Sequence, residues 1–101
     1  MEEVLNTLVD RIVRTANPDK IILFGSRSKG LEGPKSDYDL LVLKIGVKNR
    51  RSLTHQLYRT LADIPVAVDI LVDTPEKIER YKNTPGLVYA EAARGRVVYE
   101  R

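Results

Sequence analysis

The sequence predicts a small α/β (α+β) domain, in which helices pack against a mixed β-sheet of three to four strands. Short apolar runs typical of buried strands alternate with stretches in which apolar residues recur at helical spacing. The 101 residues suit one small domain, and 43% hydrophobic residues are enough for one core. We therefore expect residues 1–101 to form a single domain.

The first third of the chain predicts a helix followed by a strand. Apolar residues of segment 2–16 fall on one stripe at helical spacing, and Asn17-Pro18 ends that helix. Residues 20–24 are a continuous apolar run, which is typical of a buried strand.

Two glycine-containing breaks frame the next strand. Gly25-Ser26 ends the first strand, and residues 27–36 form a basic loop. The second strand is expected from Asp37 to Leu43, before a turn marked by Gly46 and Asn49.

The rest of the chain predicts a second helix, a third strand, two further helices and a last short strand. Leu53, Leu57 and Leu61 recur every four residues and predict a second amphipathic helix, and residues 66–72 predict a third strand. Threonine as a cap and proline at the first helical position predict a helix start at Thr74-Pro75-Glu76 and another at Thr84-Pro85. The last helix should run to about Arg94 and stop at Gly95, before a short strand at 97–99.

Composition excludes several classes of protein. With no cysteine, neither disulfides nor thiolate metal sites can form. No apolar run approaches the roughly 20 residues of a membrane span, and the acidic, amphipathic start is not a signal peptide. We therefore expect a cytoplasmic protein with no membrane partner.

The positive charge is concentrated in one segment. Residues 44–62 contain five basic residues and no acid, although the whole chain has a net charge of only +3. This segment is either a solvated helix with basic flanks or a docking surface for an acidic partner or a nucleic acid. Binding of a nucleic acid is disfavoured, because the segment has Tyr58 as its only aromatic residue and contains no RNA-binding motif.

Asp37 and Asp39 are the most unusual residues of the second strand. At positions i and i+2 they point to the same face, with Cα atoms about 6.6 Å apart. Two carboxylates this close repel each other unless a cation lies between them, so they favour a divalent metal site of the kind used in phosphoryl transfer. The alternative is a solvated strand end at which Ser36-Asp37 caps a turn.

Asp69 interrupts the apolar third strand, where an unpaired buried charge would be strongly unfavourable. It is either half of a buried salt bridge or a third metal ligand that also accepts a proton from an attacking hydroxyl. Gly25, Ser26 and Arg27 come directly after a strand and could hold phosphates through close backbone approach, hydrogen bonds and charge.

Together, the glycine-serine pair and the two aspartates match a known sequence motif. Gly25-Ser26, ten intervening residues and Asp37-x-Asp39 resemble the signature of the polymerase-β-like nucleotidyltransferases. The segments LFGSRSKG, SDYDLLV and GLVYAEAARGRVVYE are similar to the minimal nucleotidyltransferase (MNT) family, over nearly the whole chain. The resemblance implies the polymerase-β-like nucleotidyltransferase fold.

The resemblance also implies roles for the site residues. Gly25 and Ser26, helped by Arg27, would hold the phosphates of ATP, and Asp37 and Asp39 would bind two Mg²⁺ ions. Asp69 would bind one of these ions and help to activate the acceptor hydroxyl.

The family resemblance further implies an antitoxin whose partner is a HEPN toxin, in a type VII-like toxin–antitoxin pair. The chain would transfer AMP from ATP to a tyrosine of that toxin, within a homo- or hetero-oligomer. The alternative is a non-catalytic binding module that neutralises the toxin by forming a complex with it.

Overall fold

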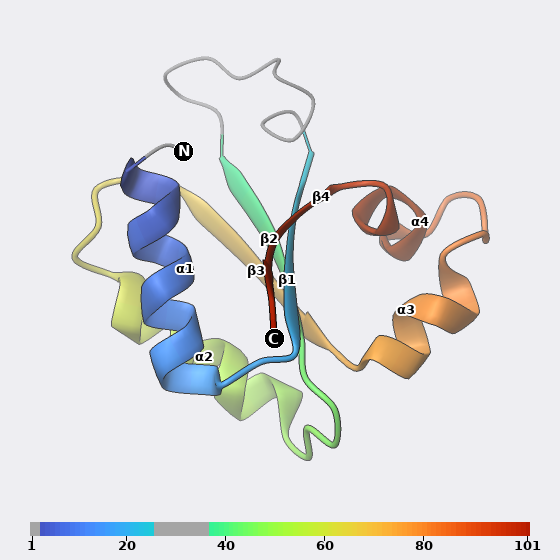
Figure 1. The fold of residues 1–101 in the computed structure, drawn as a ribbon, viewed down its shortest axis with the longest axis horizontal. Coiled ribbons are helices and arrows are strands. Elements are labelled where there is room, and N and C mark those ends of the chain that lie inside the picture. Colours follow the sequence, from blue (N-terminus) through green and yellow to red (C-terminus); the bar gives the residue numbers. More distant parts are fainter. Residues whose placement is uncertain (1–2, 26–36) are drawn as a thin grey trace.

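The computed structural model describes residues 3–25 and 37–101, which form a mixed four-stranded sheet with helices on both faces (Figure 1). The elements follow one another in the predicted order. They are α1 (Glu3–Ala16), β1 (Lys20–Phe24), β2 (Tyr38–Leu43), α2 (Arg50–Leu61), β3 (Val68–Asp73), α3 (Pro75–Tyr81), α4 (Val88–Ala93) and β4 (Arg96–Glu100).

The strand order in the sheet is β3-β2-β1-β4. β1 pairs antiparallel with β2 and with β4, whereas β2 and β3 are parallel and are connected through α2. The predicted mixed sheet is therefore confirmed, with four strands. β3 and β4 are its two edges.

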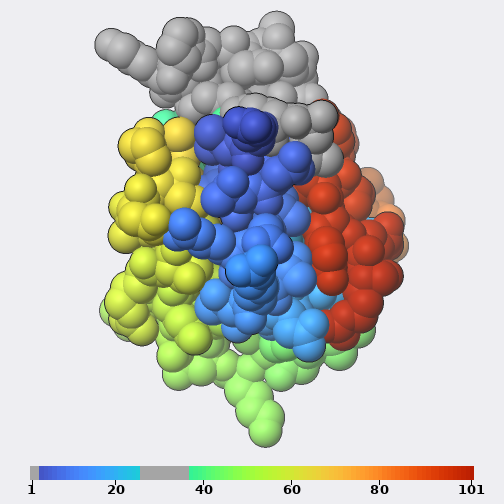
Figure 2. All heavy atoms as spheres, turned by 60° about the vertical axis from the view of Figure 1, so that its left-hand side comes forward, coloured from blue at the N-terminus to red at the C-terminus, as the bar shows by residue number. Residues whose placement is uncertain are grey.

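The larger part of the core lies between the sheet and the pair α1 and α2. The apolar stripe of α1 places Leu5, Leu8 and Ile12 against the sheet, with Leu57 and Leu61 of α2 beside them. Figure 2 shows α1, in blue, between the yellow-green residues of the α2–β3 region and the red C-terminal segment. Burial of these side chains explains why the helical spacing of both segments was visible in the sequence.

A second, smaller core lies on the opposite face, under α3 and α4. It contains Ile22, Phe24, Leu41 and Leu43 from the central strands, together with Ile78 of α3 and Ala92 of α4. Because β1 and β2 are covered on both faces, they read as continuous apolar runs in the sequence.

Capping explains where the helices begin. Asn49 accepts a 2.9 Å hydrogen bond from the backbone N–H of Ser52, so α2 begins at Arg50. Thr74 caps α3 in the same way through the N–H of Lys77, and Pro75 is its first residue, which confirms the predicted start.

The predicted start of the last helix at Thr84-Pro85 is wrong. α4 begins at Val88, and its N-cap residue, Leu87, makes no side-chain cap hydrogen bond. Gly86 has a φ of +86°, a left-handed conformation that a right-handed helix cannot include, so the helix begins after it.

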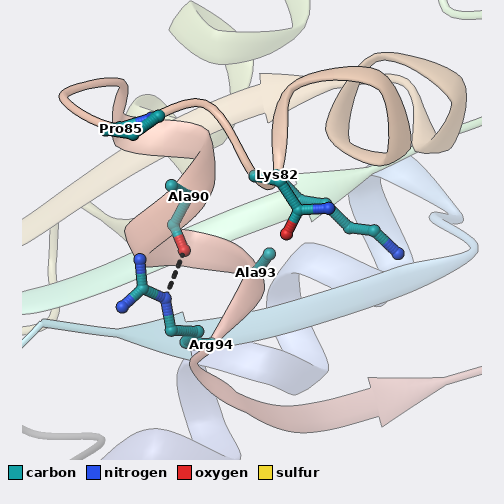
Figure 3. A pocket seen from close by; sticks show the side chains of 6 residues that line it. Lys82, Pro85, Ala90, Ala93 and Arg94 are labelled. Atoms are coloured by element: carbon teal, nitrogen blue, oxygen red, sulfur yellow. Dashed lines mark hydrogen bonds between the residues drawn. The ribbon is translucent and has the colours of Figure 1, made fainter.

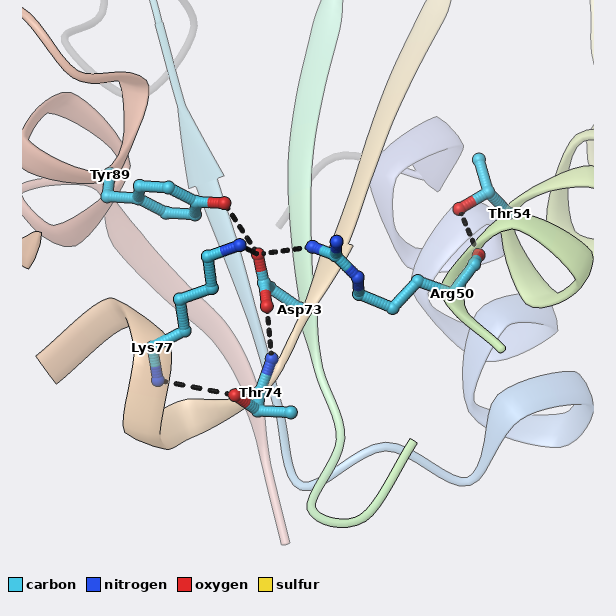
Figure 4. A network of polar contacts seen from close by, with 6 residues as sticks. All are labelled: Arg50, Thr54, Asp73, Thr74, Lys77 and Tyr89. Carbon is cyan, nitrogen blue, oxygen red and sulfur yellow. Dashed lines mark hydrogen bonds and ion pairs between the residues drawn. The ribbon is translucent and has the colours of Figure 1, made fainter. Parts of the chain in front are cut away.

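A buried carboxylate joins four elements at the end of β3 (Figure 4). Asp73 is 1% exposed and receives hydrogen bonds from Arg50 (2.9 Å), Tyr89 (2.7 Å) and the N–H of Thr74 (2.9 Å). The Lys77 ammonium lies 3.8 Å away. Because a buried carboxylate is stable only when it is paired, this cluster holds α2, α3 and α4 against the sheet.

The helices of the described residues are all too short or too polar to cross a membrane.

Candidate functional site

The candidate site lies at the end of the sheet where β1 ends and where β2 and β3 begin (Figure 1). Asp39 pairs in register with Phe24 on the antiparallel side and with Asp69 on the parallel side. The sheet therefore places Asp39 between the Phe24-Gly25 strand end and Asp69. Residues that are 14 and 30 positions away from Asp39 in the sequence become its neighbours.

Gly25 lies directly against the Asp39 side chain. A β-carbon built on Gly25 would overlap the Oδ2 atom of Asp39 and would lie 3.2 Å from its Cγ. Gly25 also has a φ of +74°, a conformation that favours glycine. Two independent constraints therefore require glycine at this position.

Several effects raise the pKa of the Asp39 carboxyl above its ordinary value. Burial is the largest, followed by the negative charges of Asp69 and Asp37, a hydrogen bond with Asp69, and the charge of Glu91. The two carboxyl groups of Asp39 and Asp69 are therefore in contact. An acidic pair of this kind binds a proton or a cation more readily than isolated carboxylates do.

Asp69 is not buried, contrary to the burial inferred from its apolar neighbours. It is exposed because it is the second residue of β3, at the end of the sheet. The alternative of a buried salt bridge for Asp69 is therefore wrong. The buried carboxylate of this strand is Asp73 instead, four residues further along.

The other predicted site residues divide into two groups. Asp37 is exposed, precedes β2 and acts on Asp39 through its charge. Ser26 and Arg27 lie outside the described residues, so their predicted contacts with phosphates stay predictions.

Carboxylate oxygens are the ligands that a hard cation such as Mg²⁺ prefers. Burial and the neighbouring negative charges raise the pKa of Asp39, and a bound cation relieves this repulsion. The donor set therefore fits Mg²⁺. Across residues 3–25 and 37–101, no three acidic or histidine side chains come close enough together to hold a metal ion. The structure thus shows one contacting pair, Asp39 and Asp69, with Asp37 as a charged neighbour.

Two acidic residues were missed in the sequence, one that acts on this site and one at the opposite end of β3. Glu91 of α4 acts on Asp39, although it is 52 positions away and belongs to no motif. Asp73 follows Asp69 at spacing i+4, so both lie on the same face of β3. That spacing was a readable signal for Asp73, whereas no local pattern indicated Glu91.

A hollow of about 440 Å³ lies beside α4, between the end of α3 and the last turn of α4 (Figure 3). Lys82, Pro85, Ala90 and Arg94 contribute to its lining, and the Arg94 Nε–H donates a 3.2 Å hydrogen bond to the carbonyl of Ala90. None of the predicted site residues within the described ranges lines it. The site at the end of the sheet and this hollow are therefore separate features.

Comparison with known families agrees with the fold. The family model described as polymerase beta nucleotidyltransferase matches residues 6–101. The chain belongs to this family. In this polymerase-β-type nucleotidyltransferase, β1, β2 and β3 supply Gly25, Asp39 and Asp69 to one end of the sheet. No curated protein sequence matches the chain significantly.

Solved structures show the same fold in toxin–antitoxin complexes. A crystal structure described as a toxin–antitoxin with AMP-PNP has 20% sequence identity and a TM-score of 0.54, covering 94% of this nucleotidyltransferase and 73% of the other chain. A mutant of the MntA-HpeT toxin–antitoxin has 17% identity and a TM-score of 0.56, with coverage of 95% and 73%. At sequence identities of 17% and 20%, the structural similarity establishes only that the fold is shared.

Proposed function

We propose that this nucleotidyltransferase transfers AMP from ATP to a hydroxyl group, that of a tyrosine, on a HEPN toxin. It would thereby act as the antitoxin of a type VII-like toxin–antitoxin pair. The observation that carries the proposal is the contact of the Asp39 and Asp69 carboxyls beside Gly25, in a chain of the nucleotidyltransferase family. The similar folds found in toxin–antitoxin complexes, one of them with AMP-PNP, support the choice of acceptor and nucleotide.

The proposed reaction is a substitution at the α-phosphorus of ATP. The tyrosine oxygen forms a new bond to that phosphorus, and the bond from the phosphorus to the oxygen bridging to the β-phosphate breaks. Pyrophosphate leaves with the electron pair of the broken bond, and Asp69 accepts the proton of the hydroxyl. Its exposure at the end of β3 leaves the Asp69 carboxylate accessible to an incoming hydroxyl.

Asp37, Asp39 and Asp69 would hold Mg²⁺, two ions in all, which neutralise the charge of the triphosphate. Gly25, Ser26 and Arg27 would bind the phosphates. Gly25 suits phosphate binding because it has no side chain at the point where the backbone passes the Asp39 carboxylate.

The experiment is mass spectrometry of a purified HEPN toxin after incubation with the nucleotidyltransferase, ATP and Mg²⁺. We expect a mass gain of one or more AMP groups. Asp39→Asn should slow the transfer by about 100-fold or more, because it removes charge from the reacting centre. Asp10→Asn is the matched control, since Asp10 lies on α1 and, among the described residues, forms an ion pair with Arg14 of its own helix alone.

A second candidate function is a non-catalytic antitoxin. The observation in its favour is that the described residues bring two carboxyls into contact and not three. It predicts no mass gain, a stable complex between the two proteins, and full neutralisation of the toxin by Asp37→Asn. Equal AMP transfer by wild type and Asp39→Asn would refute the proposed site itself.

A further inference from the structure

Three polar side chains form a stripe along one exposed side of α2. Arg51, His55 and Arg59 follow one another at intervals of four residues, so each lies about one helical turn, roughly 6 Å, beyond the last. All three are exposed, and together with Asn49 and Ser52 they line a hollow of about 340 Å³. We call these three residues the α2 stripe.

A larger hollow, of about 540 Å³, lies beside the first half of the α2 stripe. It shares Asn49, Arg51 and His55 with the smaller hollow, and β3 closes its other side. Lys48, which precedes α2, contributes a further cation to its lining. The two hollows therefore adjoin each other and form one recess along α2, and the side chain of His55 belongs to both.

The positive charge of this recess is largely uncompensated. Among the described residues, no acid lines either hollow. No ion pair within the described part of the chain involves Lys48, Arg51 or Arg59. Three free cations around a recess attract an anionic ligand.

Two acids that could neutralise these cations are engaged elsewhere. Asp63 follows Arg59 by four residues, but its carboxylate is held by both terminal nitrogens of the Arg11 guanidinium. Asp73 is buried and pairs with Arg50, the one arginine of the larger hollow that is not free (Figure 4). The charge of the α2 stripe is therefore available to an anion from outside the fold.

The lining of the recess favours a nucleic acid over an acidic protein. Every residue that lines the smaller hollow is polar, whereas the centre of a protein–protein interface is apolar and rich in aromatic residues. Interfaces with nucleic acids are more polar and much more positively charged. The aromatic ring of His55 lies between two arginines of the stripe, where a base can stack on it.

The structure changes the count of aromatic residues that spoke against a nucleic acid in the sequence. Tyr58 lies against β3, where its hydroxyl accepts the N–H of Ile70, and it does not line the recess. His55, which was not counted, does line it. A single strand is favoured over a duplex, because the bases of a duplex are already stacked on one another and cannot reach His55.

We propose that the α2 stripe binds a single-stranded nucleic acid. Phosphates of the strand contact Lys48, Arg51 and Arg59, and one base stacks on the His55 ring. Lys48 and Arg51 follow the end of β2 that is remote from Asp39, so this site is separate from the acidic pair. The proposal goes beyond AMP transfer and holds whether or not the acidic pair is catalytic.

The test is a titration of a fluorescein-labelled oligouridylate of about ten nucleotides with the whole chain, followed by anisotropy. We expect saturable binding, and a plot of the logarithm of the binding constant against that of the salt concentration should have a slope of about −2, as for three phosphates on a single strand. Arg51→Gln should weaken binding about fivefold near 0.1 M salt and make the slope less steep by about 0.7. Arg96→Gln removes an exposed arginine of β4 and is the matched control, with an effect below about twofold.

A second pair of variants tests the stacking. His55→Ala removes the ring and should weaken binding about fivefold or more. His55→Phe keeps an aromatic ring and should bind within about twofold of wild type. Because the His55 side chain is exposed, neither substitution disturbs the core.

Four results would overturn the proposal. The first is the absence of saturable binding at low salt. The second is equal weakening by Arg51→Gln and Arg96→Gln, which would mean attraction to net charge alone. The third is equal binding by His55→Ala and wild type, which would exclude stacking on this ring. The fourth is equal or tighter binding of a polyglutamate peptide of the same charge, lost in Arg51→Gln, which would make the stripe a surface for an acidic protein.

Discussion

The Tyr89 hydroxyl lies 2.7 Å from the buried carboxylate of Asp73 and donates a hydrogen bond to it. Tyr89 also stacks on Tyr81, with ring centroids 5.9 Å apart, and the Lys77 ammonium lies 5.5 Å from its ring centre. Tyr89 thus connects α4 to the end of β3 and to α3. The helix that carries Glu91 is held in place from the opposite end of the sheet.

Removing the Tyr89 hydroxyl should destabilise the fold. We expect Tyr89→Phe to lower the free energy of unfolding by about 1–2 kcal/mol, because a buried carboxylate loses one of its donors. Urea unfolding measures this change. Tyr81→Phe is the control, because no described group accepts a hydrogen bond from Tyr81, and its effect should stay below about 0.5 kcal/mol. Equal losses from both variants would show that the bond to Asp73 is unimportant.

Replacement by asparagine should affect the stability of the fold differently at two aspartates on the same face of β3. Asp73→Asn leaves Arg50 and Lys77 without their anion, so we expect a loss of about 3 kcal/mol in the free energy of unfolding. Asp69→Asn removes an exposed carboxylate that repels Asp39, and it should be neutral or stabilising. Chemical denaturation of both variants checks the contrast, and a larger loss from Asp69→Asn would contradict it.

A comparison of Gly25→Ala with Gly86→Ala separates the steric effect of an added β-carbon from the effect of a left-handed backbone. Alanine at a left-handed φ costs about 1 kcal/mol of stability, and here its β-carbon would also displace the Asp39 carboxylate. Gly86 has a similar φ but nothing within 4 Å of a built β-carbon, so Gly86→Ala carries the conformational penalty alone. We expect the larger loss of stability for Gly25→Ala, measured by thermal unfolding, because it adds the steric overlap to the conformational penalty. We also expect at least about a tenfold loss of AMP transfer for Gly25→Ala only. Normal transfer by Gly25→Ala would argue against a role for this strand end.

The raised pKa of Asp39 predicts a pH-dependent effect of Asp39→Asn. The folded state binds a proton at Asp39 more tightly than the unfolded state, so wild-type stability falls as pH rises from 3.8 through the folded pKa. In EDTA, Asp39→Asn should therefore melt at a higher temperature than wild type near pH 7.5, and the advantage should vanish below pH 3.8. Melting curves across this range, with Asp10→Asn as the control, check it. A lower melting temperature for Asp39→Asn near pH 7.5 would contradict the proposed repulsion.

Local sequence patterns predicted the elements but not every boundary. Thr74-Pro75 and Thr84-Pro85 have the same residue types, yet only the first begins a helix, because Gly86 follows the second in a left-handed conformation. Periodicity reports which residues are apolar, and it cannot detect one glycine's backbone angle.

The candidate site was predicted in part for a similar reason. The pairing of Asp39 with Asp69 follows from the parallel register, and the apolar residues around Asp69 revealed an unusual acid without revealing its exposure. The burial of Asp73 depends on Arg50, Lys77 and Tyr89, which have no common spacing in the sequence. Contacts of this kind appear only once the strands and helices are placed.

The parallel pairing of β2 with β3 also bears on how the site comes into being during folding. Asp39 and Asp69 are 30 residues apart and meet only after the chain has crossed over through α2. Closing a loop of that length has an entropic penalty before any contact offsets it, so non-local pairing of this kind is slow compared with helix formation. A growing chain on the ribosome therefore has no acidic pair until β3 has emerged and docked, and activity at this site would report that β3 has paired with β2.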